Sequence, residues 1–420
     1  MLGIFERLNQ IESFKSWAEH HVLTSEHKTI LSFIKSIQKT IENNKPAYSS
    51  RSTVVFPISN FVIKPVGNIC NLGCCYCLAK IHKSTRRYFE SNMSIGLVEE
   101  IILQMARYCS GRVSIIWTGG EVLLAGIDFF KKVIGIQKNI TTKNKHIEIV
   151  NKIQTNAVML NQRWIDFLKQ NDFRVSLSLD GSERDHNRSR TYRNFSGTYK
   201  DVIRGIRMLR QANMDFGTIA TIIPAHSRDP AAFIKTFLDL GITRLLIHQS
   251  FDEAMLLSPE DFADFMIALF DAWLLSGEKI RIVNFEDIFY SLMGAKATVC
   301  SHNGNCGKFP CIEPNGDVWI CDLPFTSEDY CFGNISDYSL AELFSSDKCQ
   351  RFFEIKSEAY RKCLLSCKWF YVCLGDCLYN YAIRNNGIVG PKSYYCKGLS
   401  KIFYHIISKF DRIITLRAGS

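Results

Sequence analysis

Residues 69–78 read ICNLGCCYCL and place four cysteines, Cys70, Cys74, Cys75 and Cys77, within eight positions. Cys70, Cys74 and Cys77 form the pattern C-x3-C-x2-C, which can hold three irons of a [4Fe–4S] cluster and leave the fourth iron open. A zinc site needs four ligands, and no Cys or His pair follows nearby at knuckle spacing. A thioredoxin-type C-x-x-C pair leaves Cys70 unexplained. The pattern therefore predicts an iron–sulfur cluster.

The other cysteines are concentrated far from this segment. The chain has 16 cysteines in 420 residues. Eleven of them fall between residues 300 and 396, and none lies between Cys109 and Cys300. In a reducing compartment so many thiols indicate metal ligands rather than disulfides.

The composition indicates a globular protein, with 46% hydrophobic residues and a net charge of +10. The basic residues are scattered rather than clustered, which is typical of solvated surfaces and not of a nucleic-acid partner. No apolar run has the length of a membrane span, and the first residues lack the apolar region of a signal peptide. We therefore expect a cytoplasmic protein with neither nucleic acid nor a membrane as its partner.

Strands and helices alternate through the first half of the chain. Strands are expected at 61–67, 113–120, 146–156, 174–181, 216–223 and 242–250. Helices are expected at 94–109, 127–140, 161–170, 198–212 and 229–240. This alternation predicts an α/β fold with a parallel sheet and helical crossovers, whose active site lies at the carboxyl ends of the strands.

The same pattern divides the chain into segments. After residue 246 the alternation stops. The expected order is a helical extension, a partial (β/α)6 TIM-like barrel, a helical bridge, a cysteine-rich domain and a last helix, at 1–52, 53–250, 251–299, 300–396 and 397–420.

The first cysteine group, with Tyr76 before its last cysteine, resembles the signature of the radical S-adenosylmethionine (SAM) superfamily. Further motifs follow at strand ends in the order of that family: Gly119-Gly120-Glu121, Gln154 and Asn156 in QTN, Ser178 and Asp180 in SLDG, and Arg190 in HNRSR. Each motif alone is equally typical of a turn or a polar strand end. The resemblance implies that these residues line a SAM pocket, with the GGE motif receiving the amino group and Arg190 pairing with the carboxylate. It also implies reductive cleavage of SAM to a 5′-deoxyadenosyl radical.

The second cysteine group resembles a SPASM domain, the auxiliary-cluster module of many radical SAM enzymes. Its start is C-x9-G-x4-C from Cys306 to Cys321, and its continuation is C-x3-C-x5-C-x3-C-x18-C, with a first gap one residue longer than the family's. The resemblance implies two auxiliary [4Fe–4S] clusters. The near set of ligands is Cys300, Cys306, Cys321 and Cys377, and the far set is Cys363, Cys367, Cys373 and Cys396. Two four-cysteine zinc sites in a binding module are the alternative.

The five remaining cysteines are interpreted as small buried hydrophobic residues. They are Cys75, Cys109, Cys311, Cys331 and Cys349.

The resemblance also implies a substrate. The stretches TGGEVLLAG and SLDGSERDHNRSRTYRNF are similar to those of cyclophane-forming and darobactin-type peptide maturases. We therefore expect an oxidoreductase that removes a Cβ hydrogen from a precursor peptide, made of leader and core, and cross-links aromatic side chains such as Trp through carbon–carbon or ether bonds. The alternatives are oxidation of a sulfatase Cys or Ser to formylglycine, and thioether formation.

Two further roles follow from the same resemblance. Asp322, next to Cys321, occupies the place of the residue proposed to take a substrate proton in sulfatase-maturating enzymes. A general base is needed there because the product forms only when a proton also leaves. An external electron donor such as flavodoxin or ferredoxin is the expected protein partner.

Overall fold

The computed structural model describes residues 58–79, 83, 87–226, 229–277, 279–292, 295–325, 327–385 and 387–418. The helical extension predicted at residues 1–52 lies outside them. None of the described helices is both long and apolar enough to cross a membrane.

One ten-stranded sheet organises the molecule, with the strand order β10-β9-β8-β1-β2-β3-β4-β5-β6-β7. Its strands are β1 (Asn60–Ile63), β2 (Gly111–Trp117), β3 (Ile147–Thr155), β4 (Arg174–Ser178), β5 (Phe216–Ile222), β6 (Arg244–Gln249), β7 (Arg281–Ile282), β8 (Cys311–Ile312), β9 (Asp317–Trp319) and β10 (Cys331–Asn334). Neighbours from β1 to β7 are parallel, and so are β1 and β8. The β8–β9 and β9–β10 pairs are antiparallel. The carboxyl ends of β1 to β6 therefore meet at one rim.

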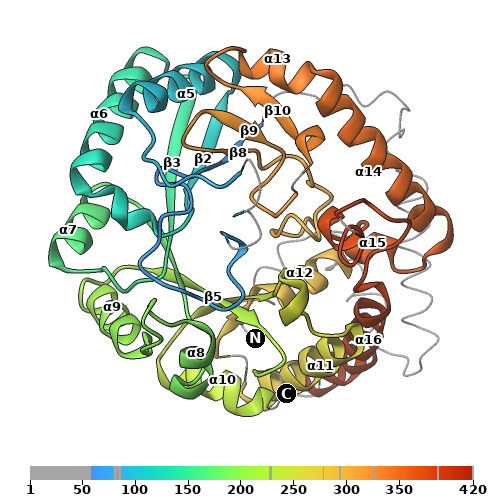
Figure 1. Cartoon of the computed structure of the whole chain (residues 1–420). Helices are drawn as coiled ribbons and strands as arrows, with labels where there is room; N and C mark the ends of the chain where they lie inside the picture. Colours follow the sequence, from blue (N-terminus) through green and yellow to red (C-terminus); the bar gives the residue numbers. More distant parts are fainter. Residues whose placement is uncertain are drawn as a thin grey trace.

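Helices form an outer ring around these strands (Figure 1). In the barrel they are α5 (Ile95–Tyr108), α6 (Ile127–Lys143), α7 (Gln162–Gln170), α8 (Glu183–Ser189), α9 (Tyr199–Gln211) and α10 (Pro230–Asp239). The later ones are α11 (Pro259–Leu275), α12 (Val283–Leu292), α13 (Leu340–Ser345), α14 (Asp347–Ser366), α15 (Phe370–Cys373) and α16 (Cys396–Ala418). Short 3₁₀ turns lie at Val122–Ala125, Glu253–Met255, Glu328–Tyr330 and Leu378–Tyr381.

Side-chain caps fix where several helices begin. Ser94 accepts a hydrogen bond from the backbone N–H of Leu97 at the start of α5, as its sequence position predicts. Asp229 caps α10 in the same way, with a proline at its first turn, where a missing N–H has no cost. These local signals place each helix directly after the strand-end loop that precedes it.

The six predicted strands and their helical crossovers are confirmed, but the prediction that the alternation stops after residue 246 is wrong. β7 extends the parallel sheet beyond β6, and β8 extends it beyond β1. Both strands have only two residues, which is too short for a periodic pattern. The cysteine-rich part therefore continues the barrel sheet through the β8–β9–β10 segment.

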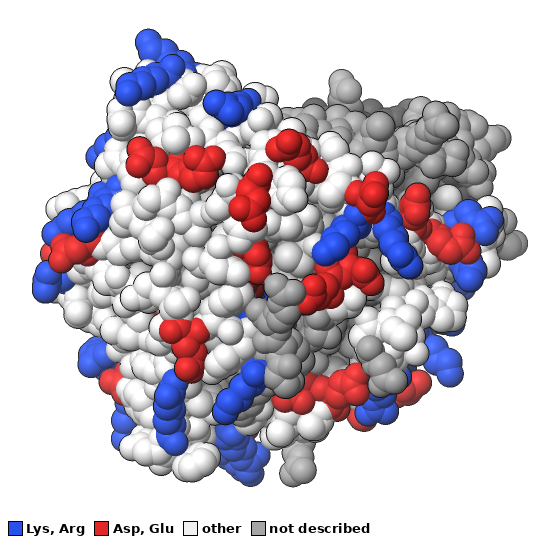
Figure 2. Space-filling view, turned by 45° about the horizontal axis from the view of Figure 1, so that its top comes forward, with Lys and Arg blue, Asp and Glu red and all other residues white. Residues whose placement is uncertain are grey.

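The last helix returns to the barrel wall, where α16 lies beside α11 (Figure 1). The ring of Phe262 on α11 packs against Tyr395, at 5.1 Å between centroids. Phe270 of α11 contacts His405 of α16, at 6.1 Å. The charged surface is mixed: on the face that Figure 2 shows, Lys and Arg lie among Asp and Glu, as their scattered sequence positions predict.

Candidate functional site

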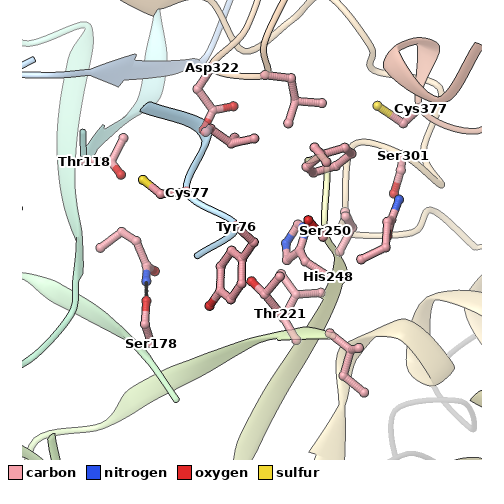
Figure 3. Close-up of a pocket in the computed structure, with 18 of the residues that line it drawn as sticks. Tyr76, Cys77, Thr118, Ser178, Thr221, His248, Ser250, Ser301, Asp322 and Cys377 are labelled. Atoms are coloured by element: carbon pink, nitrogen blue, oxygen red, sulfur yellow. Dashed lines mark hydrogen bonds between the residues drawn. The ribbon is translucent and has the colours of Figure 1, made fainter. Parts of the chain in front are cut away.

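The three cysteines of the C-x3-C-x2-C pattern line one cavity of about 430 Å³. It lies at the carboxyl ends of the barrel strands and extends to the cysteine-rich domain (Figure 3). Cys75 is not among its lining residues. The backbone N–H of Cys75 instead donates to the carbonyl of Ser189, at 2.9 Å. The structure thus separates the three predicted ligands from the spare cysteine between them.

The Gly-Gly turn after β2 packs directly on the cysteine segment. Gly120 donates its backbone N–H to the carbonyl of Gly67, at 2.8 Å. A Cβ at Gly120 would lie 2.1 Å from the carbonyl oxygen of Ile69, a distance that no side chain can accept. Glycine is therefore required here for close backbone approach, and both Gly119 and Gly120 line the cavity.

Glu121 lies behind the cavity wall rather than in it. It is 1% exposed, and its carboxylate accepts hydrogen bonds from the backbone N–H groups of Leu123 and Asn156 and from the hydroxyl of Thr155. Burial raises the pKa of this carboxyl group, and the three hydrogen bonds oppose the rise. In this structure Glu121 joins the β2 and β3 ends, and so holds Asn156 at the cavity.

Asp180 is the centre of a buried network. One carboxylate oxygen accepts hydrogen bonds from Tyr76, Ser189 and Arg190, and the other accepts from the backbone N–H of Thr221. Burial alone raises the pKa of Asp180, but the charge of Arg190 and the hydrogen bonds outweigh it and hold the pKa at about 2. The carboxylate is therefore ionised at any working pH, and it orients Tyr76 and Arg190, which line the cavity.

The remaining predicted SAM residues also lie at the cavity wall. Gln154 donates to the hydroxyl of Ser178, at 3.1 Å (Figure 3). Asn156 donates to the side-chain oxygen of Asn71, at 2.8 Å, inside the cysteine segment. Polar strand ends and the cysteine segment thus share one hydrogen-bonded wall.

The cysteine-rich domain closes the opposite side of the cavity. Cys377 and Ser301 lie across from Cys77 and Ser178, and Asp322 lies above them in this view (Figure 3). Of the near set, Cys300 and Cys377 line the cavity, and burial together with the charges of Cys306 and Cys300 raises the pKa of Cys377. The far set lines a second, small cavity together with Asp376. Asp376 borders both cavities.

The donor sets fit iron–sulfur clusters. The cysteines that the structure describes form no disulfide, and eleven of them make up the three predicted sets of three, four and four. Within the part of the chain that the structure describes, no three His, Cys, Asp or Glu side chains converge on one metal ion. Thiolates are the usual ligands of iron–sulfur clusters, and the three cysteines of the first set, which would leave one iron open, lie at the wall of the cavity.

Some cavity residues were not predicted from the sequence. His248 lies near the end of β6 and Ser250 follows that strand, Thr221 lies near the end of β5, and Thr118 follows β2 (Figure 3). Burial lowers the pKa of His248, and the charge of Asp322 only partly offsets this, so the ring is neutral near pH 7. His248 and Ser250 could have been predicted from the sequence, because HQS stands at the end of an apolar strand, as QTN and SLDG do.

A buried charge cluster ties β1 to the cysteine-rich domain. Lys64 and Arg87 both donate to the same carboxylate oxygen of Glu313, at 2.8 and 3.2 Å. Arg87 also donates to the backbone carbonyls of Cys321, Leu323 and Phe325. It therefore holds the loop that carries Asp322.

Two protein-family models match the chain. Residues 65–238 match the Radical SAM superfamily. Residues 306–368 match the SPASM iron–sulfur cluster-binding domain.

Among curated proteins, the chain is similar to sulfatase-maturating enzymes. It is 27% identical to the cysteine-type anaerobic sulfatase-maturating enzyme of Clostridium perfringens over 86% of this chain and 98% of that protein. It is also 27% identical to the serine-type enzyme of Bacteroides thetaiotaomicron, over 83% and 90%.

The chain is also similar to solved structures. Native anSMEcpe with bound AdoMet and Cp18Cys peptide matches with a TM-score of 0.77 and 27% identity, over 84% of this chain and 98% of that chain. Streptococcus suis SuiB bound to precursor peptide SuiA matches with a TM-score of 0.57 and 14% identity, over 89% and 90%. The likeness to SuiB concerns the fold alone.

Proposed function

We propose that this chain, a radical SAM enzyme with a SPASM domain, oxidises the side chain of a Cys or Ser residue in a peptide or protein substrate. The fold class and the cofactors predicted from the sequence, [4Fe–4S] clusters and SAM, are confirmed by the domain matches. The identity of the substrate residue is our proposal. It replaces aromatic cross-linking as the favoured reaction, because the two curated relatives described above are a cysteine-type and a serine-type sulfatase-maturating enzyme.

The observation that carries the proposal is the shared cavity. It brings the three cysteines of the first group and the SAM-motif residues within one space with Asp322 and His248. The relative anSMEcpe holds both AdoMet and a peptide in its structure, and this chain covers almost all of that protein. One wall of the cavity carries the residues of the SAM motifs, and the opposite wall is polar. Such a cavity suits a reaction between SAM and a second molecule.

The cofactors supply one step of chemistry when bound: reductive cleavage of SAM, which yields the 5′-deoxyadenosyl radical that takes a hydrogen atom from the substrate. Cys70, Cys74 and Cys77 are the proposed ligands of the SAM cluster. The near and far sets are the proposed ligands of two auxiliary clusters. Arg190, which pairs with Asp180, is the proposed partner of the SAM carboxylate. Gln154, Asn156 and Ser178 offer further hydrogen-bonding groups at the cavity wall.

We assign proton removal to Asp322. Its side chain lines the cavity on the side of the cysteine-rich domain, and no hydrogen bond from another described side chain engages it. Once a hydrogen atom has left the substrate carbon, the product forms by loss of one proton and one electron. A Cys side chain then becomes a thioaldehyde, which water converts to the aldehyde with release of hydrogen sulfide.

Asp322→Asn is expected to lower aldehyde formation by roughly 100-fold or more, because a positioned general base contributes about that much. Formation of 5′-deoxyadenosine should fall far less, since the variant leaves the opposite wall intact. Quantifying both products in the same reaction gives their ratio. Asp329→Asn, an exposed aspartate in the same domain, is the control. If Asp322→Asn preserves the ratio, Asp322 is not the base.

The function is tested with peptides that span the modified residue of a bacterial sulfatase and carry Cys, Ser or Ala there. Mass spectrometry after anaerobic reaction should show aldehyde from the Cys or Ser peptide and none from the Ala peptide. Failure of both peptides, with SAM still cleaved, contradicts the proposal. A precursor peptide with aromatic residues is then the next substrate, and loss of two hydrogens with a new linkage in its fragments identifies cross-linking.

A further inference from the structure

One part of the substrate cavity is apolar and lies outside the SAM motifs. Three helices that follow the SAM-motif strands reach the cavity wall there: α11, α12 and α16. Among the described residues of these helices, none that lines the cavity is charged. With the segment after β6 they contribute six apolar side chains, which we call the apolar lobe: Phe251, Phe262, Met266, Ile288, Leu399 and Ile402.

Helical spacing gives the lobe a continuous wall. Phe262 and Met266 are four residues apart on α11. Leu399 and Ile402 are three residues apart on α16. Residues at these spacings lie on the same face of a helix. The two helices lie side by side (Figure 1), and the ring of Phe262 packs against Tyr395, just before α16, at 5.1 Å between centroids. The apolar faces of α11 and α16 therefore meet at this end of the cavity.

The lobe belongs to the interior of the protein. Its four most buried side chains are each no more than 5% exposed, although they line the cavity; these are Phe262, Met266, Ile288 and Ile402. Transfer of apolar surface from water to an apolar environment is favourable, and apolar cavities inside proteins bind apolar guests. The lobe therefore favours an apolar group over a polar one.

Two polar side chains at the border of the lobe are engaged within the protein. Asn284 of α12 accepts a hydrogen bond from the backbone N–H of Ile247, at 2.8 Å, and donates to the carbonyl of the same residue, at 2.9 Å. Tyr395 donates its hydroxyl to the carbonyl of Leu257, at 3.4 Å. Both side chains thus serve the protein backbone, and the apolar side chains decide what the lobe binds.

The lobe is continuous with the reacting end of the cavity. Residues 246–251 all line it. His248 and Ser250 point into the cavity (Figure 3), and Phe251 directly follows them in the lobe. The SAM motifs stand at the ends of β2, β3 and β4, and β5 separates these strands from β6 in the sheet. A peptide that reacts beside the SAM motifs can therefore place a neighbouring side chain in the lobe.

We propose that the apolar lobe binds a large aliphatic or aromatic side chain of the substrate peptide, close in sequence to the oxidised Cys or Ser. The inference rests on the proposed function and narrows its substrate class to peptides with such a residue. A hydrophobic pocket distinguishes side chains that differ by one methylene by about 10–200-fold. Leu and Ala differ by more than one such group, so Leu should be preferred by at least about 10-fold.

The test uses peptides that cannot react, with Ala in place of the oxidised residue and Leu, Ala or Lys at one neighbouring position at a time. Calorimetry with the cluster-loaded enzyme and SAM, without a reductant, measures their affinities. At one position Leu should bind at least about 10-fold more tightly than Ala, and Lys no more tightly than Ala. Equal affinities at every position, or no binding of any peptide, overturn the proposal.

Variants of Met266 then connect the preference to the lobe. Met266→Trp fills the lobe and should abolish the preference for Leu. Met266→Ala enlarges the lobe and should shift the preference from Leu to Phe. Met105→Ala is the control, because Met105 is a fully buried methionine of α5 that is not among the lining residues. It should keep the preference of the unaltered enzyme.

Iron content is measured on every variant, and Met266→Ala decides the test if Met266→Trp does not fold. Equal changes in preference in Met266→Ala and Met105→Ala overturn the proposal. Weaker binding of SAM in the Met266 variants, with the peptide preference unchanged, assigns the lobe to SAM and also overturns it. Leu-dependent binding without aldehyde from the matching Cys and Ser peptides contradicts the proposed function and not the lobe.

Discussion

Cys74→Ala is expected to lower formation of 5′-deoxyadenosine from SAM by more than about 100-fold, while Cys75→Ala keeps most of the activity. Even residues outside the ligand shell of a metal commonly change affinity or activity by about 10–100-fold, so loss of a direct ligand should exceed that range. The two cysteines are neighbours in the chain and are both partly exposed. Only Cys74 lines the cavity.

Cys75→Ala is a closely matched control for Cys74→Ala, because each variant shortens one cysteine side chain to a methyl group in the same loop. Iron is counted after anaerobic reconstitution, and the absorbance near 400 nm is compared with the unaltered protein. Cys74→Ala should lose the share of iron that belongs to one cluster, and Cys75→Ala should lose none. Equal loss of SAM cleavage in the two variants would show that the loop, rather than Cys74 itself, had been disturbed.

The cavity wall could be predicted from the sequence because its motifs sit at strand ends. In a parallel sheet these ends meet at one rim, so TGGE, QTN and SLDG were expected to lie together although they are far apart in the chain. Gly119, Gln154, Asn156 and Ser178 do line one cavity. Strand order and residue type were sufficient for that result.

The orientation of the carboxylates could not be predicted in this way. Glu121 and Asp180 belong to the same motifs, yet neither is among the lining residues of the cavity. Their direction depends on donors that come from other segments, such as Thr155 for Glu121 and Thr221 for Asp180. A carboxylate turns toward the donors that satisfy it when it is buried, and only the tertiary structure supplies those donors.

The contacts that join the barrel to the cysteine-rich domain also could not be predicted from the sequence. β7 and β8 have two residues each. They form because they pair with neighbouring strands, and they are too short to show a periodic sequence pattern. Glu313 lies 249 positions from Lys64 and 226 from Arg87 in the sequence. No local pattern links charges at such separations.

Arg87→Met is expected to destabilise the protein by about 3–5 kcal/mol, the range for removing one partner of a buried ion pair. Arg87 and Glu313 have fully buried side chains, and one oxygen of Glu313 accepts no hydrogen bond from the residues that the structure describes. Three backbone carbonyls also lose their donor, and each buried polar group left unpaired adds a further cost. Lys64 remains beside Glu313 and limits the loss.

Thermal unfolding of the cluster-loaded protein measures this effect, and Arg112→Met is the control. Arg112 pairs with Glu148 at 3.1 Å, but both side chains are more than half exposed, at 63% and 61%. Such a pair contributes about 0–1 kcal/mol, so the control should barely change the midpoint. An equal shift in the two variants would contradict a structural role for the buried cluster.

Arg87→Lys separates the charge of Arg87 from its shape. Lysine keeps the positive charge for Glu313 but has a single ammonium group, which cannot match the planar fork that reaches Cys321, Leu323 and Phe325 together. The variant should therefore recover part of the stability lost in Arg87→Met and still loosen the loop that carries Asp322. Faster hydrogen exchange in residues 321–325, with stability partly restored, is the expected signature. Full recovery of both would mean that Arg87 acts through its charge alone, and that other contacts hold Asp322 at the cavity.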